Sequence, residues 1–113
     1  MRLAYCALLA VGCGGQPSDT GDGCDDLPVV NWASFGEGFM REQCGSCHSP
    51  VTANRYGAPE DVHFETADEV WAQKDAILVS AASAEPTMPP GGGATEDDRT
   101  LLRWWLECAP EGT

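Results

Sequence analysis

Hydrophobic residues recur at helical spacing in three stretches of this chain, over residues 34–44, 67–79 and 96–107. No stretch of any length alternates between apolar and polar residues, as a half-buried strand would. The segments between the helical stretches, residues 49–61 and 84–94, are rich in proline and glycine, which predicts loops. The pattern therefore predicts an all-α fold of about three main helices.

Each expected helix starts with a capping signal. The caps and the acidic residues that support them are Ser34 with Glu37, Thr66 with Glu69, and Thr95 with Glu96, Asp97 and Asp98. The first helix also contains Gly36 and Gly38, each of which weakens a helix by about 1 kcal/mol. Close approach by another helix is one reason for two glycines in so short a helix.

The N-terminal residues are typical of an exported protein. Residues 1–12 have one positive charge, Arg2, followed by an apolar run, as in a short export signal. The run ends in small residues before Cys13, which resembles a bacterial lipoprotein signal in which that cysteine is lipidated; a plain secretory signal is the alternative. The run is too short to span a membrane, which takes about 20 residues. Residues 13–26 are mostly small, polar and acidic and predict a flexible tether, so the folded domain is expected over residues 27–113.

The strongest chemical signal is the pentapeptide Cys44-Gly45-Ser46-Cys47-His48. C-x-x-C-H is the attachment sequence of a c-type haem, in which two thiols bond the vinyl groups of the porphyrin and the histidine binds the iron. A zinc site would need further ligands at matching spacing, and the sequence does not supply them. A redox dithiol would be expected beside a βαβ unit, which the pattern does not predict. The motif therefore predicts one covalently bound haem c.

The remaining cysteines are consistent with export. Cys6 would leave with the signal and Cys13 would carry the lipid, which leaves Cys24 and Cys108 as an even pair. In an exported protein such a pair is expected to form a disulfide, with two unrelated thiols as the alternative.

The chain is strongly acidic, with 18 Asp and Glu against 6 Lys and Arg and a net charge of −12. Nucleic acid and anionic lipid surfaces are poor partners for such a chain. Redox proteins with basic docking surfaces fit its charge better, and an acidic surface that serves only solubility is the alternative.

The order of these parts resembles a class I cytochrome c over roughly residues 34–110. That family has a helix running into C-x-x-C-H, one or more middle helices, a methionine loop and a C-terminal helix that crosses the first. In this resemblance Cys44 and Cys47 correspond to the two thioether cysteines and His48 to the proximal ligand. Met88, in Thr87-Met88-Pro89-Pro90, corresponds to the methionine whose sulfur is the distal ligand.

Two further matches are less complete. Gly36 stands where the family has a glycine at the helix crossing, but Met40 stands where it has an aromatic residue. Trp104 or Trp105 would be the aromatic residue of the last helix that packs there. Pro59 lies about where the family has a proline whose carbonyl accepts the N–H of the proximal imidazole and so fixes its ring.

The resemblance implies a monohaem electron carrier rather than an enzyme, with His48 and Met88 as iron ligands. Its redox partners would be other proteins, met on the periplasmic side of a bacterial membrane to which a lipid anchors the chain. His63 is the alternative distal ligand. A haem-based sensor with an open or labile distal site, a small peroxidase and a lipoprotein dithiol are the other functions that the residues leave open.

Overall fold

The computed structural model describes residues 23–113, and within them the chain forms helices joined by loops, without a strand. The all-α prediction is therefore confirmed for this part of the chain. The expected signal, Cys13 and most of the expected tether lie outside the described residues. No helix within residues 23–113 is long and apolar enough to cross a membrane.

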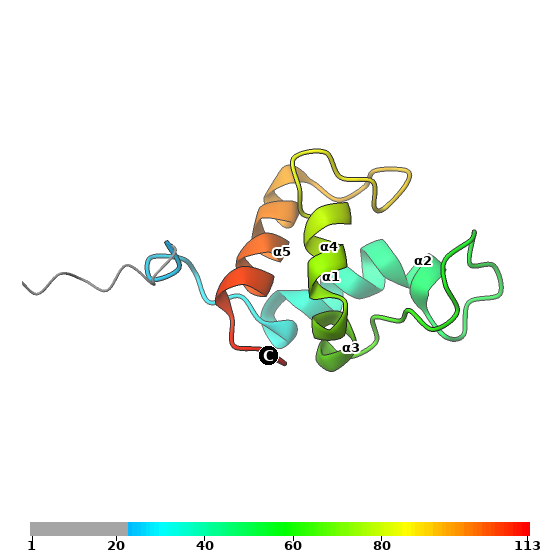
Figure 1. Cartoon of the computed structure of the whole chain (residues 1–113), viewed down its shortest axis with the longest axis horizontal. Helices are drawn as coiled ribbons and strands as arrows, with labels where there is room; N and C mark the ends of the chain where they lie inside the picture. The colour runs from blue at the N-terminus through cyan, green and yellow to red at the C-terminus, as the bar shows by residue number, and fades with distance from the viewer. Residues whose placement is uncertain (1–22) are drawn as a thin grey trace, which may run out of the picture.

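The first helix runs without a break from Trp32 to His48, although its turns vary in width (Figure 1). Its four parts are the π-helical η1 (Trp32–Gly36), α1 (Glu37–Phe39), the π-helical η2 (Met40–Cys44) and α2 (Gly45–His48). In the π-helical parts an N–H group bonds the carbonyl five residues back, as Gly45 does to Met40. Such wide turns are rare in proteins, and those that occur are frequently found at functional sites.

This helix begins two residues earlier than the sequence predicts. Its N-cap is Asn31, whose side-chain oxygen accepts from the Ser34 N–H at 2.8 Å, while Ser34 Oγ accepts from the Asn31 N–H at 3.1 Å. Ser34 therefore completes a capping box opened by Asn31, and the prediction that it caps the helix is wrong. Glu37, the expected partner of Ser34, instead forms an ion pair with Arg41 at 2.6 Å.

The expected middle helix is present but divided. Gln73 leaves the helical angles (φ −107°, ψ 14°) and separates α3 (Ala67–Ala72) from α4 (Lys74–Ser80). The capping box predicted for its start is confirmed, since Thr66 Oγ1 accepts from the Glu69 N–H at 3.3 Å and the Glu69 carboxylate accepts from the Thr66 N–H at 3.0 Å.

The last helix, α5 (Glu96–Cys108), crosses the first helix at Gly36. Thr95 caps α5 as predicted, and Asp98 closes the capping box. A Cβ added to Gly36 would lie 2.5 Å from Cη2 of Trp105, so only glycine allows the helices to approach this closely. The predicted close approach is therefore confirmed at Gly36, with Trp105 as the aromatic residue. A Cβ added to Gly38 would meet nothing within 4 Å.

The hydrophobic core lies where α5 meets the first helix, α3 and α4. Trp105, Leu102 and Leu106 of α5 are completely buried, and Met40 of the first helix is 1% exposed. The indole of Trp105 is packed edge-on against Trp71 of α3, with 6.3 Å between ring centroids. Met40 is therefore a core residue near the middle of the helix that carries the C-x-x-C-H motif.

Cys24 and Cys108 are joined by a disulfide, with 5.6 Å between their Cα atoms and a sequence separation of 84. The bond attaches the segment before the first helix to the last turn of α5. Cys24 lies within the expected tether, and the Leu27 N–H donates to its carbonyl at 3.2 Å. The disulfide therefore attaches the chain to α5 at Cys24, three positions before the expected start of the folded domain at residue 27.

Candidate functional site

The C-x-x-C-H motif occupies the C-terminal end of the first helix. Cys44 ends the wide turn of η2, and Cys47 and His48 lie in α2. The helix thus extends four residues beyond its expected end at Cys44, and it carries both cysteines and the histidine on one rigid element.

Neither Cys44 nor Cys47 is in a disulfide, and both are partly buried. Cys44 packs against the hydrophobic core. Burial and, to a smaller extent, the neighbouring Cys47 together raise the pKa of the Cys44 thiol to about 11. A redox or nucleophilic cysteine needs a lowered pKa, so this environment does not favour thiolate chemistry at neutral pH.

The imidazole of His48 is held by a main-chain carbonyl. Its Nδ1 lies 3.3 Å from the Val62 carbonyl oxygen, and its ring centroid lies 5.0 Å from that of Phe64. A carbonyl oxygen only accepts, so in the neutral imidazole this contact places the proton on Nδ1 and leaves the lone pair on Nε2. This is the tautomer that a metal-binding histidine adopts when its other nitrogen is anchored.

The sequence predicts that the carbonyl of Pro59 accepts from His48, but in the structure the acceptor is the carbonyl of Val62. The Pro59 carbonyl accepts instead from Nη2 of Arg55 at 2.6 Å and from the Val62 N–H at 3.2 Å. The turn from Pro59 to Val62 carries the chain three residues further before a carbonyl reaches His48. The expected kind of contact is present, but its residue is Val62.

Arg55 holds the loop that supplies this carbonyl. Its guanidinium donates to the carbonyls of Ser49, Ala58, Pro59 and Val62, at distances from 2.6 to 3.3 Å. Arg55 belongs to no recognisable sequence motif. A lone arginine in a loop of proline and glycine is nevertheless a usable signal, because the main-chain carbonyls of such a loop need donors that no helix or strand supplies.

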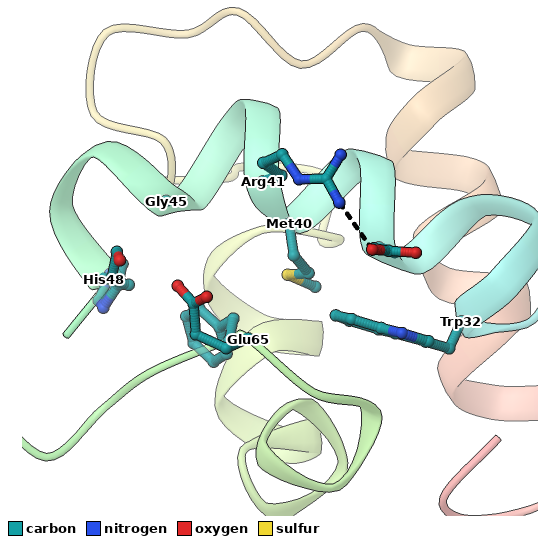
Figure 2. A pocket seen from close by; sticks show the side chains of 9 residues that line it. Trp32, Met40, Arg41, Gly45, His48 and Glu65 are labelled. Atoms are coloured by element: carbon teal, nitrogen blue, oxygen red, sulfur yellow. Dashed lines mark hydrogen bonds and ion pairs between the residues drawn. The ribbon is translucent and has the colours of Figure 1, made fainter. Parts of the chain in front are cut away.

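A cavity of about 400 Å³ lies against the first helix beside His48 (Figure 2). His48 lies at one end and Trp32 at the other, with the sulfur of Met40 between them. The residues that line it come from the helix and from the segment before α3, and they are Trp32, Glu37, Met40, Arg41, Gly45, His48, Ser49, Phe64 and Glu65. The cavity has an aromatic and thioether floor and a charged rim.

Met88 lies in the loop between α4 and α5, and its side chain is 40% exposed. Main-chain contacts hold the loop at this residue: the Met88 N–H donates to the Ser80 carbonyl at 2.9 Å, and the Met88 carbonyl accepts from Nη1 of Arg99 at 2.8 Å. The same loop touches the first helix, because a Cβ added to Gly93 would lie 3.1 Å from Oε1 of Gln43. Gln43 immediately precedes Cys44, so the methionine loop and the C-x-x-C-H motif are neighbours.

The two candidate distal ligands, His63 and Met88, lie in different loops of the structure. His63 is partly buried in the segment between Val62 and Phe64, on the side of the chain that supports His48. Met88 belongs to the separate loop held by Arg99. Neither lines the cavity that His48 lines. The structure thus brings Cys44, Cys47 and His48 together on one helix end and leaves Met88 partly exposed in the neighbouring loop.

Within residues 23–113, no three side chains of His, Cys, Asp or Glu gather into a group able to hold a metal ion. Comparison of the chain with protein-family models, with curated proteins and with solved structures found no match. Any functional assignment therefore depends on the motif and on the geometry around it.

Proposed function

We propose that this chain is a monohaem c-type cytochrome that carries single electrons between redox proteins, with a cytochrome c-like fold. The proposal rests mainly on the two free thiols and the anchored histidine of the C-x-x-C-H motif. Two unpaired thiols and a histidine lie at one helix end, and the Nδ1 contact with Val62 leaves Nε2 of His48 available to a metal.

The residues present fit a covalent haem. Cys44 and Cys47 would form its thioether bonds, and His48 would bind the iron through Nε2. The haem would supply a one-electron Fe(III)/Fe(II) couple. The chain itself fixes the imidazole ring through Val62 and packs Cys44 against the core, and its methionine loop passes close to the same helix where Gly93 lies beside Gln43.

The arrangement of helices also supports a cytochrome c-like fold. A helix leads into the motif, and the last helix crosses it at Gly36 and Trp105. The loop with Met88 joins the middle helices to the last one. With His48 and Met88 both bound, the iron would have no open site, and the neutral sulfur would favour Fe(II) and a relatively high potential.

The proposed setting is the periplasmic side of a bacterial membrane, with a lipid on Cys13 as the anchor. The Cys24–Cys108 disulfide is compatible with an oxidising compartment. The acidic charge of the chain suits redox partners with basic surfaces, met across small interfaces of less than about 1,200 Å².

The proposal is tested by covalent attachment. The exported protein, made in cells that mature c-type haem, is expected to carry the mass of one haem after denaturation. The double variant Cys44→Ala/Cys47→Ala should lose it, and Ser46→Ala, which changes only an intervening residue of the motif, should keep it. A wild-type chain without covalent haem would refute the proposal.

One observation favours a second function, a haem-based sensor or small-ligand binder. Met88 is 40% exposed and does not line the cavity beside His48. A distal ligand placed in this way would be easily displaced. The sensor function predicts a five-coordinate, high-spin wild-type protein that binds carbon monoxide at once when reduced, whereas the electron carrier would be low-spin and slow to bind it.

A further inference from the structure

The guanidinium of Arg55 is surrounded by main-chain carbonyls of its own loop. Nη1 donates to Ser49 at 2.8 Å, and Nε donates to Ala58 at 3.3 Å. Nη2 donates to Pro59 at 2.6 Å and to Val62 at 3.2 Å. The planar fork of an arginine offers five N–H donors in fixed directions, which a lysine cannot reproduce. Arg55 therefore ties both ends of the loop, residues 49–62, to a single point.

The charge of Arg55 is not paired with a carboxylate. In the described part of the chain the one ion pair joins Arg41 to Glu37. Carbonyl dipoles solvate the Arg55 charge but do not cancel it. Arg99 and Arg103 also donate only to main-chain carbonyls, but among these three arginines only Arg55 has an acceptor that also contacts His48.

Arg55 and His48 share one acceptor. The Val62 carbonyl oxygen lies 3.2 Å from Nη2 of Arg55 and 3.3 Å from Nδ1 of His48. A carbonyl oxygen has two lone pairs and accommodates both donors. The guanidinium draws electron density from this oxygen and leaves less of it for the imidazole N–H.

We propose that Arg55 is a positioning residue that holds the Val62 carbonyl against His48 and, through its charge, sets how strongly that carbonyl pulls on the Nδ1 proton. The inference rests on the proposed function, since it concerns the ligand strength of His48 toward haem iron. When the Val62 carbonyl accepts a weaker hydrogen bond from Nδ1, the imidazole donates less electron density to the iron through Nε2, which favours Fe(II). The positive charge itself also disfavours Fe(III), so both effects raise the reduction potential.

Three variants separate the positioning of the Val62 carbonyl from the effect of the positive charge. Arg55→Met removes both the charge and the hydrogen bonds to the loop carbonyls. Arg55→Lys keeps the charge but cannot reproduce the planar set of guanidinium donors. Arg103→Met is the matched control, because Arg103 also binds a loop carbonyl, that of Ala82 at 2.8 and 3.1 Å, on a segment that does not contact His48. Haem content is measured first. The reduction potential and the solvent exchange of the His48 Nδ1 proton, by NMR of the Fe(II) protein, are measured next.

Arg55→Met is expected to shift the Fe(III)/Fe(II) equilibrium toward Fe(III) by about tenfold, which is ~59 mV for one electron, because the loss of the positive charge outweighs the weaker hydrogen bond of the released carbonyl, which alone would favour Fe(II). Exchange of the Nδ1 proton should become about tenfold faster, because the carbonyl is no longer held. Arg55→Lys should keep most of the potential but show the faster exchange. Arg103→Met should change neither quantity.

Arg55→Met protein that binds haem with an unchanged potential and unchanged Nδ1 exchange overturns the inference while leaving the proposed function intact. If both Arg55 variants fail to bind haem, the ring-nitrogen chemical shifts of His48 in the haem-free chains decide. A single Nδ1–H tautomer in the wild type and a mixture in the variants supports the positioning role. The same tautomer population in all of them overturns it.

A wild-type chain that binds no haem defeats the proposed function and, with it, the effect of Arg55 on the potential. The positioning role is still decided by the same tautomer measurement on the haem-free wild-type and Arg55→Met chains. Haem binding therefore tests the proposed function, and the His48 tautomer tests the role of Arg55 separately.

Discussion

At the scale of single residues, Cys44 is in a different state from an ordinary exposed thiol. It packs against the core, and burial, followed by the nearby Cys47, raises its pKa from 9.0 to about 11. The thiol therefore stays protonated at neutral pH. This separates the site from redox dithiols, whose attacking cysteine has a lowered pKa.

The raised pKa predicts how the stability of the haem-free chain depends on pH. Below pH 9 the Cys44 thiol is protonated in both the folded and the unfolded chain, and its contribution to the free energy of unfolding is fully present. Between pH 9 and about 11 the unfolded chain loses the proton first, so the free energy of unfolding falls as pH rises. The loss is at most roughly 3 kcal/mol. Urea unfolding of the haem-free wild type and Cys44→Ala across this range measures it.

Cys44→Ala should lack this part of the pH dependence, while the background from other titrating groups should remain in both chains. Parallel curves for the two chains would show that the Cys44 thiol is not protected by burial.

The residues of the site differ in how far sequence can predict them. Cys44, Cys47 and His48 stand out in the sequence because the proposed haem attachment requires three side chains at one fixed spacing. Val62 has no such signal, because it acts through its carbonyl, which every residue has; the sequence predicts Pro59 in its place. Arg55 was missed because its partners are also main-chain atoms, scattered from Ser49 to Val62.

At the scale of elements, the helices were predicted more accurately than their ends. Thr66 and Thr95 cap α3 and α5 as their sequences indicate, because threonine followed by an acidic residue three positions on is a local signal. Asn31 and Ser34 form the same kind of box without an acidic residue, so the first helix was placed too late. The break at Gln73 has no proline or glycine to mark it.

The crossing of the first helix and α5 gives a prediction with an internal control. Gly36→Ala places a Cβ 2.5 Å from the Trp105 ring and should lower the free energy of unfolding by about 1–3 kcal/mol. Gly38→Ala is on the same helix, where an added Cβ meets nothing within 4 Å, and should raise it by about 0.5–1 kcal/mol. Urea unfolding of the three proteins measures both changes.

If both alanines act in the same direction, the close contact at Gly36 does not control the crossing. Helix propensity alone would then account for the data.

The methionine loop depends on Arg99 of α5. Nη1 of Arg99 donates to the carbonyls of Ala81 at 2.6 Å and Met88 at 2.8 Å, and so it joins the two ends of the segment that carries Met88. Arg99→Met should loosen this segment. In the haem protein, added imidazole should then displace Met88 about tenfold more readily, the equivalent of one charge-assisted hydrogen bond of about 1.5 kcal/mol.

Imidazole titration of the Fe(III) protein, followed by its visible spectrum, provides the measurement. Arg103→Met is the control, because Arg103 binds Ala82 and not the Met88 carbonyl. Equal imidazole affinity in wild type and Arg99→Met would show that this arginine does not hold the distal ligand.

At the scale of the whole molecule, the disulfide and the helix crossing stabilise the same end of the fold. The Cys24–Cys108 bond closes a long loop from the N-terminal segment to the last turn of α5. In the chain-entropy model a loop of this length contributes about 4–5 kcal/mol by restricting the unfolded state. Such a bond matters in a small domain, whose core alone supplies little excess stability.

The opposite end of the molecule carries the proposed chemistry. Figure 1 shows α2 and the green loop that follows it extending away from α5 and the C-terminus. On that side Arg55, Val62 and His48 form one connected group, and Met88 reaches the same helix through its loop. A rigid anchored end and a site built from loops are consistent with a carrier that exchanges electrons at one face.

The central claim is that His48 and Met88 bind the iron of one covalent haem. The most direct test is a reduced-minus-oxidised visible spectrum of the exported protein, recorded beside Met88→Ala and His63→Ala. We expect low-spin covalent haem in the wild type and in His63→Ala, and a change to high-spin in Met88→Ala. Low-spin haem that persists in Met88→Ala, or a wild type without haem, would contradict the account.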